Sequence, residues 1–234
     1  MSKLKKLTNS QKSIWLTEQF YKNTSINNIV GYLKIRKNTN FEALEKAFNY
    51  LVIKNDSYKL KFKIENNILK QSIEDFIYEK LEIIDLANEE QLTEFERNFA
   101  QKPFEINENN FMFKAVMLRF PDTSGILVLS THHLISDAWS MSLTLEEIFD
   151  NYNKLVSGQS IDLKPNPSYF NFIKSNDEYS KSEKFEKDKE YWNEQFKEFP
   201  NIISYKEKET SIVSTRKVFH FDEKIINKIE VCNF

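Results

Sequence analysis

The run THHLISDAWS, residues 131–140, places two adjacent histidines, His132 and His133, just ahead of Asp137. The whole chain has three histidines, so imidazole groups are concentrated here. A neutral imidazole, with an ordinary pKa of about 6.5, can take a proton from an attacking nucleophile when a carboxylate or carbonyl group holds its orientation. The same residues could instead bind a metal ion, or end a buried strand and cap the following helix.

Strand geometry argues against a metal ion. Adjacent residues of a strand point to opposite faces, so His132 and His133 cannot easily share one ion. His133 and Asp137 could share a face, but a metal site needs three or four protein ligands, and the chain has no cysteine cluster. The third histidine, His220, is distant in sequence. We therefore expect no metal.

Two interpretations of the histidine pair stay open on these residues alone. In one, a histidine is a hydrogen-bonded core residue and Asp137 only caps the next helix. In the other, one histidine is a general base, and Asp137 fixes the loop that carries it, directly or through a cation. A Ser–His–Asp triad through Ser136 or Ser140 is disfavoured because no G-x-S-x-G turn is present.

The residues around the pair predict a central strand followed by a long helix. Residues 125–131 are apolar on both faces, which is typical of an interior strand, and residues 111–120 form its predicted neighbour. A helix should follow from about Ala138 to Val156. Its predicted inward side chains are Leu143, Leu145, Ile148, Phe149 and Tyr152.

The rest of the chain predicts alternating strands and helices. Thr8 should cap a first helix, with Ile14, Trp15 and Phe20 inward, and Asn40 should cap a second. The remaining expected elements are a strand at 26–36, a hairpin of 58–65 and 68–74 that turns at Asn66-Asn67, a strand at 78–86, a helix at 88–101, a linker at 157–167, aromatic-rich helices after it, and a strand at 215–222 before an incipient helix.

Composition excludes several classes of function. The net charge is -2 and lysines are scattered, so nucleic acid is not an expected partner. No apolar run approaches the ~18–20 residues of a membrane span, and no membrane partner is expected. The single cysteine, Cys232, fits a reducing cytoplasm. With three glycines in the chain, glycine-rich phosphate loops are not expected.

Several short runs together resemble a known family. HHLISDAWS resembles the HHxxxDG motif of the condensation domains of nonribosomal peptide synthetases, which share a superfamily with chloramphenicol acetyltransferase. Residues 8–15 (TNSQKSIW) are similar to the family's S-x-A-Q-x-R-[LM]-W, and residues 54–62 (KNDSYKLKF) to its R-H-E-x-L-R-T-x-F. Residues 169–173 (YFNFI) and 189–196 (KEYWNEQF) are weaker matches.

The resemblance implies an α/β (α+β) fold, namely a chloramphenicol-acetyltransferase-like mixed sheet with flanking helices. This would be one lobe of a two-lobe condensation domain. Residues 1–165 would form the lobe that carries HHxxxD, and residues 166–234 a helical segment and the start of the second lobe. The chain matches only the first lobe, so we expect it to be cut short, with the missing C-terminal lobe as a partner.

The resemblance also implies the chemistry. Amide formation would join an acyl donor and an aminoacyl acceptor, both thioesters on the phosphopantetheine arms of peptidyl or acyl carrier proteins, with no cofactor bound directly. His133 would be the catalytic base or positioning group, with His132 and Asp137 in the same motif and Asp137 structural, in a salt bridge. The substrate-binding residues would be Ala138, Trp139 and Ser140. Since the first histidine of the motif is not aspartate, the cyclisation class is disfavoured.

Three departures from the family pattern keep other functions open. Ser13 stands for an arginine, Asn55 for a histidine and Ala138 for a glycine. A positive φ at Ala138 would cost about 1 kcal/mol, and its methyl group would narrow the acceptor site. The alternatives are a truncated or degenerate lobe that binds carrier proteins or acts as a scaffold, and a CoA-dependent acyltransferase of the same superfamily. Even as a condensation domain, the fragment alone is expected to be incomplete or inactive.

Overall fold

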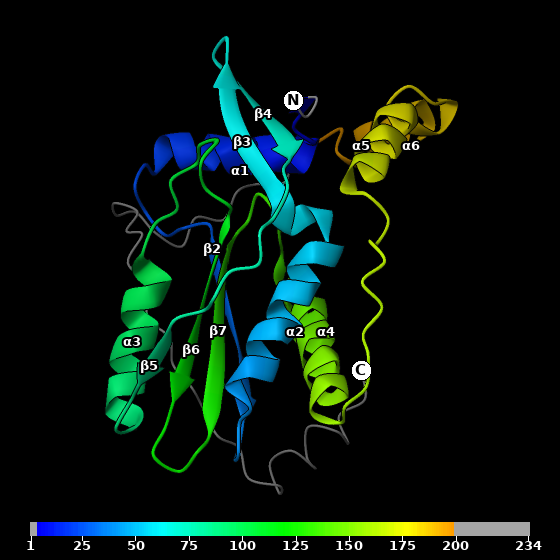
Figure 1. The fold of residues 1–234 in the computed structure, drawn as a ribbon. Coiled ribbons are helices and arrows are strands. Elements are labelled where there is room, and N and C mark those ends of the chain that lie inside the picture. The colour runs from blue at the N-terminus through cyan, green and yellow to red at the C-terminus, as the bar shows by residue number, and fades with distance from the viewer. Residues whose placement is uncertain (1–3, 199–234) are drawn as a thin grey trace, which may run out of the picture. The chain divides into compact units, whose positions relative to one another are not determined.

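The computed structural model describes residues 4–198 of the chain. Residues 4–194 belong to the larger of two compact units. The larger unit contains a four-stranded sheet whose neighbouring strands are antiparallel, except that the last two are parallel (Figure 1). In spatial order the strands are β2 (Asn28–Ile35), β7 (Gly125–His132), β6 (Phe113–Arg119) and β5 (Ile83–Asp85). The predicted mixed sheet with flanking helices is therefore confirmed.

β7 is the interior strand that leads to the histidine pair. It pairs with β2 on one side and β6 on the other, and all eight of its residues are buried. Leu127 and Leu129 face one layer of helices, whereas Ile126 and Val128 face the other. The prediction of a central strand that is apolar on both faces is confirmed.

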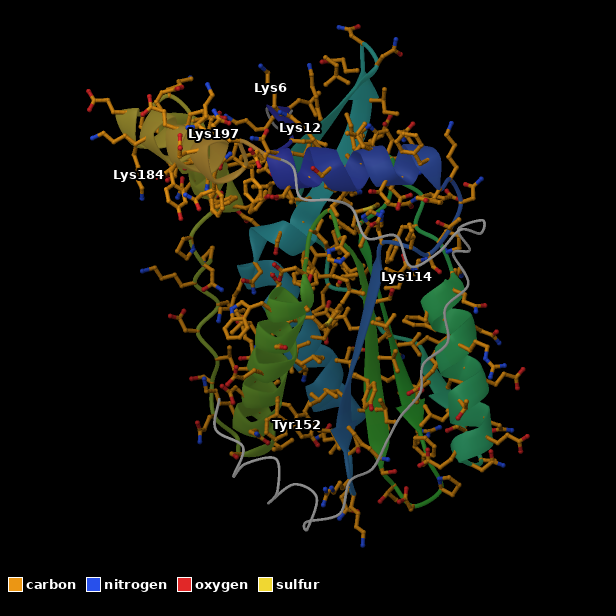
Figure 2. All side chains as sticks on the ribbon, turned by 180° about the vertical axis from the view of Figure 1, so that it is seen from behind. Lys6, Lys12, Lys114, Tyr152, Lys184 and Lys197 are labelled. Atoms are coloured by element: carbon orange, nitrogen blue, oxygen red, sulfur yellow. The ribbon has the colours of Figure 1, made fainter. Side chains whose placement is uncertain are left out.

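Helices cover both faces of this sheet. α2 (Phe41–Lys54) and α4 (Ala138–Val156) pack together on one face, and α3 (Glu89–Gln101) packs on the other. As predicted, Asn40 caps α2, where its side chain accepts from the N–H of Ala43 at 3.0 Å. The Asn40 N–H donates to the hydroxyl of Tyr152 at 3.1 Å, near the C-terminal end of α4 (Figure 2). This bond ties the two helices together far from the histidine pair.

A smaller sheet lies beside the first helix. Its strands are β1 (Lys5–Lys6), β4 (Ile68–Ile73) and β3 (Leu60–Glu65), in that spatial order. Asn66 and Asn67 turn the hairpin at φ 52° and 61°, in the left-handed region that asparagine tolerates better than most residues. α1 (Asn9–Phe20) begins with a capping box between Thr8 and Gln11, as the Thr8 cap predicts.

Three further elements complete the described residues. They are the 3-10 helix η1 (Asp56–Lys59), α5 (Tyr169–Tyr179) and α6 (Glu183–Gln195). Residues 157–167 form neither helix nor strand, in agreement with the predicted linker. The predicted strand at 215–222, the helix after it, His220 and Cys232 lie outside the described residues. None of the helices within residues 4–198 is both long and apolar enough to cross a membrane.

Some predicted inward side chains are wrong. Phe20 is 82% exposed because it is the last residue of α1, and Leu143 and Phe149 are 50% and 43% exposed. α4 buries the predicted Ile148 and Tyr152 together with Met141, Thr144 and Asn151, which were not predicted. Two of these residues are polar. The prediction considered only apolar residues, so it placed the buried face of α4 at the wrong angle around the helix axis.

Two predicted strand boundaries are also wrong. The expected strand at 78–86 is reduced to Ile83–Asp85, the part that pairs with β6. The expected start of the hairpin at Tyr58 is instead part of η1, because Tyr58 N–H donates to Asn55 O in a helical turn.

Substitutions of two phenylalanines test which side chains stabilise the fold. Replacing the fully buried Phe48 by Ala should lower the free energy of unfolding by about 3–5 kcal/mol, since it leaves a cavity between α2 and the sheet. The matched variant Phe20→Ala should change it by less than about 0.5 kcal/mol. Chemical denaturation followed by circular dichroism measures both. Equal losses for the two variants would contradict this packing.

Candidate active site

The candidate active site begins where β7 ends and α4 starts. Asp137 caps α4: one carboxylate oxygen, Oδ1, accepts from the Ser140 N–H and from the Ser140 hydroxyl, both at 2.7 Å. These two bonds hold the pKa of Asp137 below its ordinary value, and His133 adds a smaller effect in the same direction. Among residues 4–198, no cation lies within salt-bridge distance of Asp137, so its predicted ion pair stays a prediction. The predicted helix cap is present.

The two histidines have different surroundings, because His132 is the last residue of β7 and His133 begins the loop after it. His132 is 2% exposed, its Nε2 lies 3.0 Å from Oε1 of Glu18, and its ring packs edge-on against Phe104. Its Nδ1 accepts the N–H of Leu134 at 3.1 Å. Burial lowers the pKa of His132, with the Glu18 carboxylate acting in the opposite direction. His132 is therefore a neutral, hydrogen-bonded core residue.

His133 is half-buried and lines a hollow of about 550 Å³. Three segments form the walls: the start of α1, the loop from β7 to α4, and α5. Beside His133, the hollow is lined by residues that include Ser10, Ser13, Ile14, Ser140, Tyr169 and Phe172. Of the two histidines, His133 is thus the one placed to meet a small molecule. Ser13, which replaces the family's arginine, lies in the same hollow.

Side chains and backbone from other elements hold the loop that carries His133. The His133 N–H donates to the carbonyl of Asn27 at 2.9 Å. The carbonyl of Leu134 accepts from Nε2 of Gln11 at 3.0 Å. Gln11 is in turn hydrogen-bonded to Gln71 of β4, and both are buried. The loop is therefore fixed on both sides of His133.

Glu18, Asn27 and Gln71 were not predicted as site residues from the sequence. A signal for Glu18 was present, since it lies seven residues after Gln11 and therefore on the same face of α1. A charged residue on the buried stripe of a short helix is unusual and needs a partner inside the protein. Asn27 and Gln71 carry no comparable signal, because only the folded chain brings them to the loop.

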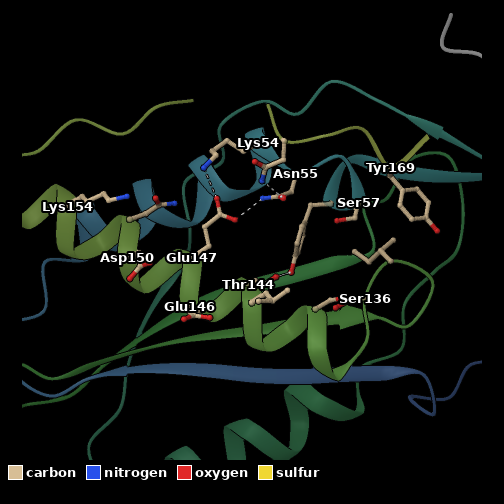
Figure 3. A pocket seen from close by; sticks show the side chains of 16 residues that line it. Lys54, Asn55, Ser57, Ser136, Thr144, Glu146, Glu147, Asp150, Lys154 and Tyr169 are labelled. Carbon is tan, nitrogen blue, oxygen red and sulfur yellow. Dashed lines mark hydrogen bonds and ion pairs between the residues drawn. The ribbon is translucent and has the colours of Figure 1, made fainter. Parts of the chain in front are cut away.

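A second hollow, of about 740 Å³, lies between the end of α2 and α4 (Figure 3). Glu147 connects its walls: the carboxylate pairs with Lys54 Nζ at 2.9 Å and accepts from Nδ2 of Asn55 at 3.2 Å. The hydroxyls of Tyr58 and Thr144 lie 2.8 Å apart, and burial raises the pKa of Tyr58 to about 12. These bonds join the second motif, residues 54–62, to α4.

The second motif also holds itself together. Asp56, which matches the family's acid, pairs with Lys59 at 3.1 Å, and Phe62 is fully buried. Asn55, in place of the family's histidine, bonds to the side chain of Asn166 at 2.9 Å as well as to Glu147. The residues of this motif therefore make structural contacts that link α2, η1 and β3.

The remaining predicted site residues lie on the first turn of α4. Ala138 begins the helix and has no positive φ, so the strain expected from replacing a glycine does not arise. Ala138 and Trp139 are exposed, and Ser140 lines both hollows. Their contact with a substrate stays a prediction. The hydroxyls of Ser136 and Ser140 donate to Asp137, which does not support a Ser–His–Asp triad.

Within residues 4–198, no group of three His, Cys, Asp or Glu side chains is arranged to hold a metal ion.

Comparison with protein families and curated sequences points to one family. The family model described as the Condensation domain matches residues 1–232. Surfactin synthase subunit 1 of Bacillus subtilis (strain 168) is 30% identical over 207 residues, which are 86% of this chain and 6% of that protein. The dimodular nonribosomal peptide synthase of the same organism is 23% identical over 202 residues, 85% of this chain and 8% of that protein.

Solved structures agree in fold. The starter condensation domain of rhizomide synthetase, crystallised as a mutant with C8-CoA and Leu-SNAC, matches with a TM-score of 0.79 at 18% identity. The match covers 88% of this chain and 48% of that one. The first condensation domain of the CDA synthetase has a TM-score of 0.72 at 18% identity, covering 86% and 52%. The chain thus spans about half the length of these solved domains and less than a tenth of the two curated relatives.

The cap at Asp137 gives a stability prediction. Asp137→Ala should lower the free energy of unfolding by about 1 kcal/mol, because the N–H of Ser140 loses its acceptor. Asp137→Asn keeps an acceptor and should lose less. Asp150→Ala, on the exposed side of the same helix, should change it by less than about 0.5 kcal/mol. Chemical denaturation at pH 7 measures all three.

The same cap predicts a pH dependence. The folded-state pKa of Asp137 is lowered, so the stability that its charge contributes is present above the unfolded value of about 3.9 and is lost as pH falls through the folded pKa. The advantage of the native chain over Asp137→Asn should therefore shrink below about pH 4. A difference in the free energy of unfolding that grows as the pH falls would contradict the assignment of Asp137 as the helix cap.

Proposed function

The chain belongs to the condensation-domain family of nonribosomal peptide synthetases, whose general reaction is amide formation, and we propose that it supplies the catalytic histidine of such a domain. Its substrates are an acyl donor thioester and an aminoacyl acceptor thioester, each carried on the phosphopantetheine arm of a carrier protein. One observation carries this proposal: His133 faces a hollow of about 550 Å³ while its neighbour His132 is buried in the core.

The proposed reaction requires little of the protein beyond position and one proton transfer. The acceptor amine attacks the carbonyl carbon of the donor thioester, the carbon–sulfur bond breaks, and the donor arm leaves as a thiolate. The amine loses a proton as the amide forms. His133 accepts this proton, and the thiolate receives it to become a thiol. Because a thioester is already activated, holding the two reactants in place supplies much of the rate.

The fixed loop supports this role for His133. A group that must meet a reacting amine works best when its own position is set in advance. The bonds from the His133 N–H to Asn27 and from Gln11 to the Leu134 carbonyl supply that constraint. Asp137 contributes as the cap of α4, and we assign its further ion pair to a cation supplied by the second lobe.

We propose that a second lobe, of the kind that the solved condensation domains possess, forms the opposite wall of the site. Two features support this: the chain spans about half of those domains, and the hollow at His133 is open. Residues 1–165 are then the lobe that bears HHxxxD. The partners are the donor and acceptor carrier proteins, and the lone Cys232 suits a cytoplasmic reaction.

Turnover tests the role of His133. The chain alone should form little or no amide from loaded carrier proteins, and adding the C-terminal lobe of a related condensation domain should restore it. In that complemented assay His133→Ala should lower the rate by about 10²–10⁴-fold, the range of a lost general base. Mass spectrometry of the carrier-bound product measures amide formation.

A control variant and an assay with CoA distinguish the proposed function from the two alternatives. Glu94→Ala, an exposed change on α3, should leave the rate unchanged, and denaturation should show His133→Ala to be folded. A rate of amide formation that His133→Ala leaves unchanged would overturn the role of His133 as general base. It would favour a scaffold that binds carrier proteins. Acetyl transfer from CoA to a small amine, without carrier proteins, would favour the CoA-dependent acyltransferase instead.

A further inference from the structure

Glu18 is a buried carboxylate that the proposed reaction does not use. It lies on α1, is 9% exposed, and one of its oxygens, Oε1, has two polar neighbours. Nδ2 of Asn27 donates to this oxygen at 2.6 Å, and Nε2 of His132 lies 3.0 Å from it. A buried carboxylate is stable only when such hydrogen bonds replace water.

The backbone fixes which nitrogen of His132 carries the proton. A peptide N–H is always a donor, so the bond from Leu134 N–H requires Nδ1 of His132 to be the unprotonated acceptor. Burial favours the neutral ring. Nε2 then carries the proton and donates it to Glu18, whose carboxylate accepts hydrogen bonds and cannot donate them. The carboxylate thus stabilises the Nε2–H tautomer that the bond from the Leu134 N–H requires.

Both peptide groups that flank His133 lead back to Glu18. The N–H of His133 donates to the carbonyl of Asn27, whose side chain bonds to Glu18. The N–H of Leu134 donates to the ring of His132, which bonds to the same oxygen. The backbone on either side of His133 is therefore held by residues that one carboxylate oxygen aligns.

We propose that Glu18 is a positioning residue for the reaction, which sets the backbone of His133 through His132 and Asn27. The proposal rests on the function proposed for His133 but concerns a different residue on a different helix. Glu18 touches no reactant. It acts by keeping His132 in the tautomer that can accept the Leu134 N–H.

The chemistry at Oε1 distinguishes two substitutions. Gln keeps an oxygen that accepts both hydrogen bonds, so Glu18→Gln should preserve the tautomer and the loop. Met has a similar length but lacks these acceptors, so Glu18→Met should release the ring of His132 and the side chain of Asn27. A displacement of about 1 Å at a reacting group can cost about 10²-fold in rate.

Ring-nitrogen NMR tests the tautomer without turnover. The chain labelled with ¹⁵N-histidine contains three imidazoles, and the signals of His132 are those lost in His132→Asn. The native chain and Glu18→Gln should show a neutral Nε2–H ring at pH 7, and Glu18→Met should move these signals. A native His132 in the Nδ1–H form, or signals unmoved in Glu18→Met, would overturn the proposal.

Turnover in the complemented assay tests the consequence for His133. Glu18→Met should lower kcat by about 10²-fold with little change in KM, and Glu18→Gln should restore most of it. Glu94→Met on α3 is the matched control and should retain full activity. Should Glu18→Met fail to fold, Glu18→Ala, which leaves room for water, replaces it with the same expected loss.

The outcomes keep the two proposals apart. Native kcat in a folded Glu18→Met or Glu18→Ala variant overturns the positioning role even if His133→Ala is inactive. Full activity of His133→Ala overturns the proposed base. In that case the positioning of His133 for catalysis falls with it, whatever the ring signals show about the tautomer.

Discussion

β7 is buried on both faces, and the chain that leaves it must satisfy its backbone polar groups inside the protein. This constraint shapes the whole site. The N–H groups after β7 are satisfied by the carbonyl of Asn27 and the ring of His132, and the carbonyl of Leu134 by Gln11. α1 and the segment before β2 must therefore lie against the end of β7. The position of the small sheet follows from the same constraint, because Gln71 of β4 is hydrogen-bonded to Gln11.

The two histidines have separate roles, which one residue could not combine. His132 belongs to the core, where its ring serves as a hydrogen-bonded link between α1 and the loop. His133 belongs to the surface of a hollow, where its ring is accessible. The end of β7 is the physical cause of this division, since His132 is the last residue of the buried strand and His133 is the first residue of the loop after it. The general-base and the buried-core interpretations of the pair are thus compatible, each with a different histidine.

The mixed sheet was predicted through the family resemblance. The sequence alone predicted the interior position of β7, the caps at Thr8, Asn40 and Asp137, and the span of α4. These depend on local patterns that neighbouring residues reveal. It failed where burial depends on partners distant in sequence. Thr144 was not assigned to the core because its partner is Tyr58, 86 residues away. Glu18 was missed despite its place on the same face of α1 as Gln11, since a carboxylate is placed inside a protein by its partners and not by its own hydrophobicity.

The separation of those partners along the chain bears on how the site forms. The bond from Gln11 to Leu134 spans 123 residues, and that between His132 and Glu18 spans 114. Contacts across such long loops form slowly because the entropy of closing the loop opposes them until other contacts are made. The arrangement around His133 therefore belongs to a late stage of folding. During synthesis, α1 leaves the ribosome long before the strand that needs it, and its carboxylate must stay solvated until β7 arrives.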